Sequence, residues 1–167
     1  MTQTRGVLAH LGSCFTAPYR VLGAAAGTFS DDGAVVRSYE TARVFGELAL
    51  ATRERLGEGS EPLEVLLEVL DGAVEGDPTG RLALYCVAVV VGPRLLVSLR
   101  DARDVVDDDA RGLIDHASDL VVAEIIAIRE LASAREDPDA GPGPGAVRAL
   151  NVALEGAGFA ESFGVGG

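Results

Sequence analysis

The chain has 167 residues, 48% of them hydrophobic, which is enough for one domain with a core and too few for two independent domains. Its 26 acidic residues outnumber 14 basic ones, and the net charge of −12 disfavours nucleic acid as a partner because phosphate binding needs a positive surface. Every basic residue is Arg, so lysine-dependent chemistry such as Schiff-base formation is excluded.

The N-terminal third predicts helices. Residues 5–27 are expected to form short helices broken near Pro18, with Thr16 as a cap, and residues 30–34 a turn. A long helix is expected from Ala34 to Leu56, ended by the "GEGS" stretch. Its apolar spacing predicts a buried side made by Val35, Tyr39, Ala42, Phe45 and Ala49, with Val44, Leu48 and Ala51 beside them.

The next helix is expected to open at Ser60, with Pro62 in its first turn. Its apolar residues follow the spacing of one helical face, namely Leu63, Leu66, Leu67, Leu70 and Val74. The stretch "EGDPTG" closes it.

The apolar stretch from Leu82 to Leu99 is the longest in the chain. Its Val content would suit a strand, but no second strand is available to pair with it, so a helix is expected. The length would cross a bilayer, but Gly92, Pro93 and Arg94 interrupt it. We therefore expect a core element, and membrane contact is disfavoured.

After this stretch, Pro93 is expected to kink the helix or to start a new one, which runs to residue 135 with a break near "DDDARG". Apolar residues recur along it at bundle spacing, namely Leu95, Leu99, Ala102, Val106, Leu113, Ala117, Leu120 and Ile128. Residues 136–145 hold three Pro and three Gly and are expected to be a linker or loop.

These elements predict an all-α, single-domain helical bundle of about five or six helices. The bundle occupies residues 1–135, and a short helix and glycine-rich tail occupy residues 146–167. Because the stretch Leu82 to Leu99 is apolar on every side and needs cover, a homodimer is expected. Two isolated cysteines, Cys14 and Cys86, and a poor secretory signal indicate a cytoplasmic location.

Glu124 is the most informative single residue, because its neighbours at helical spacing are apolar and predict a buried acid. Arg94 is the one charge in the run Leu82 to Leu99, so we expect the two to pair. A structural ion pair that sets the packing register is favoured over a polar anchor in a ligand pocket and over a general acid or base. A side chain that simply reaches solvent is the remaining reading.

Other candidate sites are weaker. The carboxylates Glu61, Glu64, Glu68, Asp71 and Glu75 lie along one side of a helix, and "DARDVVDDDARGLIDHASD" offers a second acidic face. A solvated surface is favoured over a divalent-metal site for both. His10 and Cys14, four residues apart, have the spacing of two zinc ligands or of an activated thiolate, but no further Cys or His lies nearby. No metal and no cofactor are expected, and His116 is expected at the surface.

Two functions remain open at this point. The first is a non-catalytic binding or assembly protein, regulatory or accessory, with a pocket for a small apolar or anionic ligand. The alternative is a small cofactor-independent enzyme of the lyase, isomerase or cyclase type, with Glu124 as acid or base, Arg94 holding an anionic group and Tyr85 lining the pocket.

Overall fold

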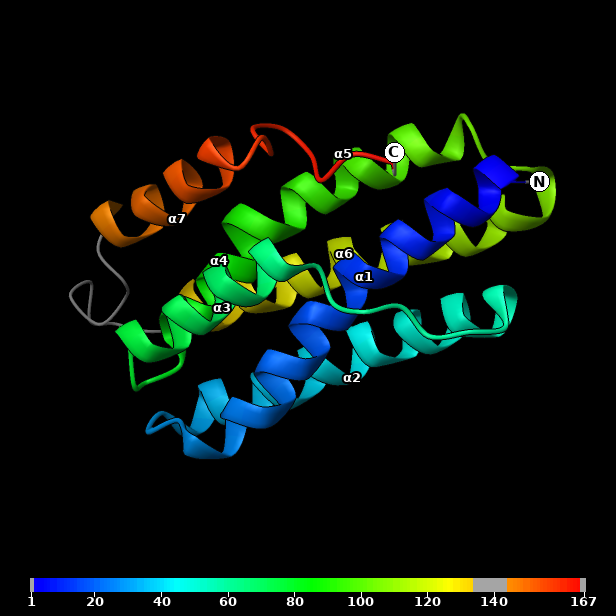
Figure 1. The fold of residues 1–167 in the computed structure, drawn as a ribbon. Helices are drawn as coiled ribbons and strands as arrows, with labels where there is room; N and C mark the ends of the chain where they lie inside the picture. Colours follow the sequence, from blue (N-terminus) through cyan, green and yellow to red (C-terminus); the bar gives the residue numbers. More distant parts are fainter. Residues whose placement is uncertain (1, 134–143, 166–167) are drawn as a thin grey trace.

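The computed structural model describes residues 2–133 and 144–165, and within these ranges every regular element is a helix. The prediction of an all-α bundle is confirmed (Figure 1). Along the chain the elements are α1 (Thr2–Ala25), η1 (Ala26–Thr28), α2 (Asp32–Leu56), α3 (Glu64–Gly76), α4 (Arg81–Cys86), η2 (Val87–Val91), α5 (Gly92–Arg103), α6 (Asp108–Ser133) and α7 (Pro144–Gly156).

The elements α4, η2 and α5 form one continuous helix, Arg81–Arg103, at the centre of the fold. Parts of this helix contact α1, α2, α3, α6 and α7, so it is covered from several directions as its apolar sequence requires. On one side of the molecule α1 packs along α2, and on the opposite side α7 lies beside α3, α4 and η2, while the chain that follows it runs along α5 (Figure 1). The side chains buried along the central helix include Leu84, Val87, Val90, Val91, Leu95 and Leu99.

Pro93 lies inside this continuous helix, and the helix accommodates it with a π-helical turn. Proline has no backbone N–H, and its ring clashes with the carbonyl four residues earlier. In η2 the Gly92 N–H donates to the Val87 carbonyl, five residues back, so the turn holds one extra residue immediately before the proline. Pro93 then falls in the first turn of α5, where its missing N–H costs little.

Pro18 also lies inside a helix, and the expected break in residues 5–27 is wrong. α1 continues through it from Thr2 to Ala25. An interior proline costs a helix about 3 kcal/mol. Phe15 and Leu22, on either side of the proline, are fully buried, and this packing outweighs the cost. Thr16 is not a cap, because its hydroxyl donates to the Gly12 carbonyl at 2.6 Å inside the helix.

The long helix α2 forms as expected, with Asp31 as its N-cap and Gly57 in the left-handed conformation at its end. Its buried side agrees with the predicted one at Ala42, Val44, Phe45 and Leu48, but Tyr39 is half-exposed, and the small polar residues Ser38 and Thr41 are fully buried. Thr41 is explained by a buried carboxylate on α6, to which its hydroxyl donates a hydrogen bond. The spacing of apolar residues alone does not predict a buried polar partner of this kind.

The remaining boundaries differ by a few residues. α3 begins at Glu64, and Ser60 lies in the connection before it, where the Leu63 N–H donates to the Ser13 carbonyl of α1 at 3.0 Å. The break between α5 and α6 comes just before the predicted position, and Asp107 caps α6 by accepting the Ala110 N–H at 3.0 Å. α7 begins inside the predicted 136–145 linker, and residues 136–143 of that linker lie outside the described residues.

Candidate functional site

Glu124 is buried in α6 with 6% of its surface exposed, as predicted, but Arg94 is not its partner. Its carboxylate accepts hydrogen bonds from two residues of α2. Arg37 Nη2 lies 3.0 Å from Oε1 and 3.1 Å from Oε2, and the Thr41 hydroxyl donates to Oε2 at 2.8 Å. Both oxygens are therefore engaged within the fold, and the cluster links α2 to α6.

Arg94 is equally buried but points toward the other side of the central helix. Its Nη1 donates to the Val90 carbonyl at 3.0 Å and to Asn151 Oδ1 of α7 at 2.8 Å, and its Nε donates to the Phe159 carbonyl at 2.5 Å. The predicted pair fails for a geometric reason. α6 approaches α5 at Gly92, and two residues along a helix turn the side chain by about 200°.

The remaining predicted candidates lie in ordinary structural surroundings. Cys14 and Cys86 are fully buried, and burial raises the pKa of each thiol to about 12, so neither is an activated thiolate. His10 Nε2 lies 2.6 Å from the Phe163 carbonyl oxygen and must donate to it, because a carbonyl only accepts. Tyr85 is half-buried on α4.

Both acidic faces are solvated, as expected. Glu64, Glu68, Asp71 and Glu75 are exposed along α3. On the second face Asp115 pairs with Arg103 at 2.8 Å and Asp108 with Arg111 at 2.7 Å. Within residues 2–133 and 144–165, no group of three or more His, Cys, Asp or Glu side chains is placed to hold a metal ion.

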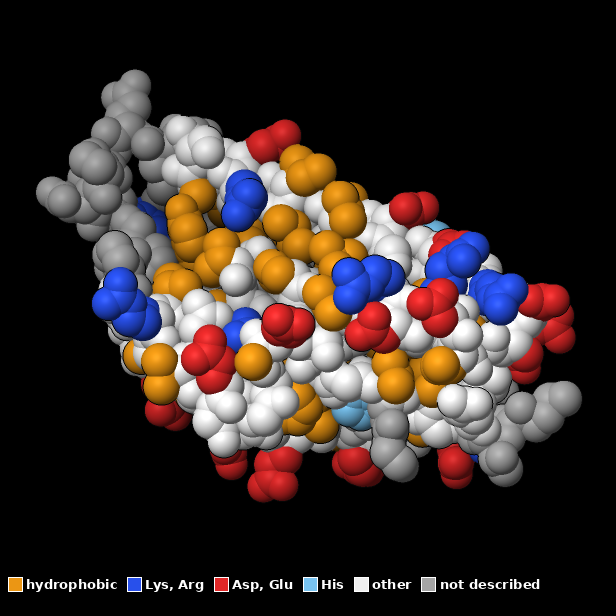
Figure 2. All heavy atoms as spheres, turned by 90° about the horizontal axis from the view of Figure 1, so that it is seen from above, with side chains coloured by type: hydrophobic (Ala, Val, Ile, Leu, Met, Phe, Trp, Pro, Cys, Tyr) orange, Lys and Arg blue, Asp and Glu red, His pale blue; other side chains and the backbone are white. Residues whose placement is uncertain are grey.

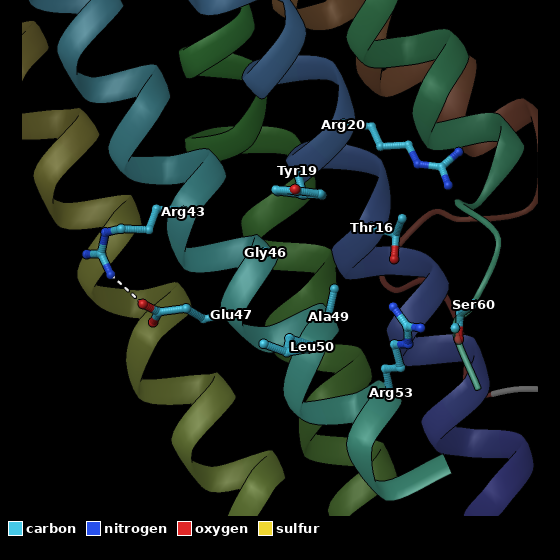
Figure 3. Close-up of a pocket in the computed structure, with 11 residues that line it drawn as sticks. Thr16, Tyr19, Arg20, Arg43, Gly46, Glu47, Ala49, Leu50, Arg53 and Ser60 are labelled. Carbon is cyan, nitrogen blue, oxygen red and sulfur yellow. Dashed lines mark hydrogen bonds and ion pairs between the residues drawn. The ribbon is translucent and has the colours of Figure 1, made fainter. Parts of the chain in front are cut away.

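A groove that the sequence did not indicate runs between α1 and α2 and has a volume of about 510 Å³ (Figure 3). Tyr19 and Leu50 form much of its apolar surface and remain 47% and 53% exposed. The Tyr19 ring lies against Gly46 of α2, where a Cβ would come within 2.7 Å of the ring. Glycine at that position therefore lets the ring approach the backbone of α2 closely.

The groove carries positive charge in an acidic protein. Three arginines line it, Arg20 from α1 and Arg43 and Arg53 from α2, against the single carboxylate of Glu47. Arg43 is already paired with Glu40 at 3.0 Å and with Glu47 at 2.6 Å. Arg20 and Arg53 have no ion-pair partner among the residues that the structure describes. Figure 3 shows both on the side of the groove where Thr16 and Ser60 also lie.

The end of the groove is closed by the connection before α3. Gly59 and Ser60 line it there, and Ser60 packs closely on α1, because a Cβ on Gly12 would lie 2.6 Å from the Ser60 hydroxyl oxygen. The hydroxyls of Thr16 and Ser60 add polar groups at this end. The groove thus combines an apolar wall with two unpaired guanidinium groups and nearby hydroxyls.

No protein-family model, curated protein or solved structure matches this chain.

The groove could not be predicted while a helix break was expected near Pro18. A continuous helix puts Tyr19 and Arg20 on α1, beside α2, whereas a break leaves their direction undefined. The available signal was Gly46 within an otherwise regular helix, since an interior glycine costs about 1 kcal/mol relative to alanine and often marks a close contact.

Proposed function

We propose that this protein is a non-catalytic binding protein whose α1–α2 groove takes a small anionic ligand with an apolar or aromatic body. The observation that carries this proposal is the pair Arg20 and Arg53, which have no partner among the described residues and lie beside the exposed apolar surfaces of Tyr19 and Leu50. The anionic group of the ligand would bind the two arginines, and its apolar body would pack on Tyr19 and Leu50.

The charge of the groove supports an anionic group. A guanidinium donates two parallel hydrogen bonds to a carboxylate, sulfonate or phosphate, and Arg is the side chain best suited to that recognition. The chain has 26 acidic residues that could have neutralised its arginines, as they do for Arg43, Arg81 and Arg103. Two arginines left open in one groove therefore favour an anion from outside the chain.

The shape of the groove supports an apolar body. Small-molecule sites usually measure about 300–1,000 Å³ and combine an apolar lining with a few polar groups. The volume of about 510 Å³ lies in that range. Tyr19 lines the groove and is 47% exposed, so an aromatic or flat aliphatic group can pack against its ring.

The alternative, a small enzyme that uses Glu124 as acid or base, has less support. Glu124 is held by Arg37 and Thr41 inside the α2–α6 contact, and Arg94 is turned toward α7. The two groups that such a mechanism would bring to one substrate therefore lie in separate surroundings.

The test uses 8-anilinonaphthalene-1-sulfonate, a probe with an aromatic body and one anionic group, and its uncharged analogue N-phenyl-1-naphthylamine. We expect the double variant Arg20→Gln/Arg53→Gln to weaken sulfonate binding by about tenfold or more, with a smaller effect on the neutral probe. Fluorescence titration measures both affinities. Circular dichroism checks that each variant stays folded.

Arg55→Gln is the matched control, because Arg55 is an exposed arginine in the last turn of the same helix and does not line the groove. It should bind both probes as the wild type does. A second variant, Gly46→Ala, should displace the Tyr19 ring and weaken both probes alike. Equal sulfonate binding by the wild type and the double arginine variant would rule out the proposed site.

A further inference from the structure

An apolar surface extends across α5 and α6 on the side of the molecule away from α2. Val122 and Ile126 of α6 are 42% and 51% exposed, and next to them the Ile125 side chain reaches Gly92 of α5. The surface continues on the central helix through half-buried Val89 and Leu96 and exposed Pro93. Figure 2, seen from above, shows hydrophobic side chains gathered in one area with charged side chains at its edges.

The exposed residues of α6 on this side have a definite order. Asp119, Val122, Ile126 and Arg129 are spaced by three, four and three residues, so they lie along one side of the helix. The two apolar residues are in the middle, with an acid at one end and a base at the other. Asp119 and Arg129 are both exposed, and neither has an ion-pair partner within the described residues.

We infer that this surface joins two copies of the chain, with α6 packed antiparallel against α6 of the second copy about a two-fold axis. When the axis passes midway between Val122 and Ile126, each Val122 faces the other copy's Ile126. Asp119 then faces Arg129 of the second copy, and Arg129 faces its Asp119. The stripe is complementary to itself only in the antiparallel direction, which a two-fold axis perpendicular to the helices produces.

The order of charges selects a second copy over other occupants. A parallel arrangement would place Asp119 against Asp119 and Arg129 against Arg129, and like charges in contact are destabilising. A lipid surface would offer no cation to pair with the acid at one end of the stripe. Anionic headgroups would also repel a chain with a net charge of −12.

The extent of the surface suits a stable dimer. A standard interface covers about 800 Å² on each partner. α6 has 26 residues and is therefore about 39 Å long, and the neighbouring residues of η2 and α5 widen the contact beside it. In the dimer, α5 and α6 of one copy pack against α5 and α6 of the other. This contact covers the face of the central helix that a single chain leaves open.

Charge reversal tests the register of the two helices. We expect Asp119→Arg and Arg129→Asp each to place like charges opposite one another twice and to weaken the dimer by about tenfold or more. The double variant Asp119→Arg/Arg129→Asp should restore the wild-type dissociation constant, because it only exchanges the two ends of each pair. Sedimentation equilibrium over a range of concentrations measures all four proteins.

Two apolar variants complete the test. Ile126→Glu should give a monomer, whereas Val36→Glu, at an exposed valine of α2, should leave the dimer intact. All of these positions are exposed, so the fold is retained, and circular dichroism verifies it. A monomeric wild type at high micromolar concentration overturns the inference, as does a double variant no tighter than the single ones or a Val36→Glu protein that dissociates like Ile126→Glu.

Discussion

At the scale of single residues, the α2–α6 contact depends on one buried carboxylate. Desolvating Glu124 is unfavourable, and Arg37 and Thr41 offset this by supplying an ion pair and a neutral hydrogen bond. The compensation is incomplete, because Arg37 Nε and the Ser38 hydroxyl are buried with no hydrogen-bond partner among the described residues. The cluster therefore specifies how α2 and α6 align more than it adds to net stability.

Removing the negative charge of Glu124 tests this role. We expect Glu124→Gln to lower the free energy of unfolding by about 1–3 kcal/mol, because the amide nitrogen cannot accept from Arg37 and leaves a partly buried guanidinium without a counter-charge. Urea denaturation measures the change. Glu130→Gln, an exposed position on the same helix, is the control and should unfold like the wild type. A Glu124→Gln protein of unchanged stability would contradict the structural role.

The burial of Glu124 could be predicted from sequence, and its partner could not. Burial follows from apolar neighbours three and four residues away on the same helix, which is local information. The partner depends on which faces of distant helices meet. Arg94 was predicted as the partner because it is isolated in an apolar run, but it binds Asn151 of α7. Arg37, on α2, was not a candidate, because nothing local to its sequence links it to α6.

At the scale of elements, the stretch after α7 shows how irregular chain is held in place. Three side chains bind its backbone. Arg94 donates to the Phe159 carbonyl, Ser98 accepts the Phe163 N–H at 2.8 Å, and His10 donates to the Phe163 carbonyl. The Phe163 ring is 1% exposed and lies 5.5 Å from that of Phe159. Glycine-rich sequence has no hydrophobic period, so this placement could not be predicted.

Phe163→Ala should therefore destabilise the whole bundle. We expect a loss of about 3–5 kcal/mol in the free energy of unfolding, because the substitution removes a buried ring and leaves a cavity beside α1 and α5. Urea denaturation gives the value. Val152→Ala, at an exposed position of α7, serves as the control and should change stability by less than about 0.5 kcal/mol. If Phe163→Ala and Val152→Ala unfolded alike, the stretch would not be part of the core.

The helices themselves were predictable where apolar spacing was regular, as in α2, α3 and α6. The two prolines inside helices were harder, since each has a different local solution. Pro93 follows a π-helical turn at Val87–Val91, and Pro18 is carried by packing on both sides. Such solutions depend on what covers the helix, which is tertiary information.

At the scale of the whole molecule, the central helix is the most apolar element, and the other helices pack around it. Its 18-residue apolar window within Arg81–Arg103 has a mean hydropathy of 2.1, and 72% of that window is buried inside the bundle. The sequence offers no second strand to pair with this stretch, so a helix was predicted there, and the structure confirms it. By length and composition this helix could also cross a membrane, and its burial by the surrounding helices is what supports a place in the core.

A vesicle-binding experiment tests that choice. We expect the folded chain to remain in the supernatant when sedimented with phosphatidylcholine vesicles or with vesicles that also contain phosphatidylserine. Inserting the central helix would strip it of α1, α2, α3, α6 and α7, and would take Arg94 from its three acceptors into lipid, at a cost of about 2.5–3.5 kcal/mol for the arginine alone. The acidic surface opposes binding to the anionic vesicles further. The protein could instead cosediment with the vesicles while its circular dichroism and urea midpoint stay those of the free protein. That result would show that the exposed apolar surface of α5 and α6 binds lipid.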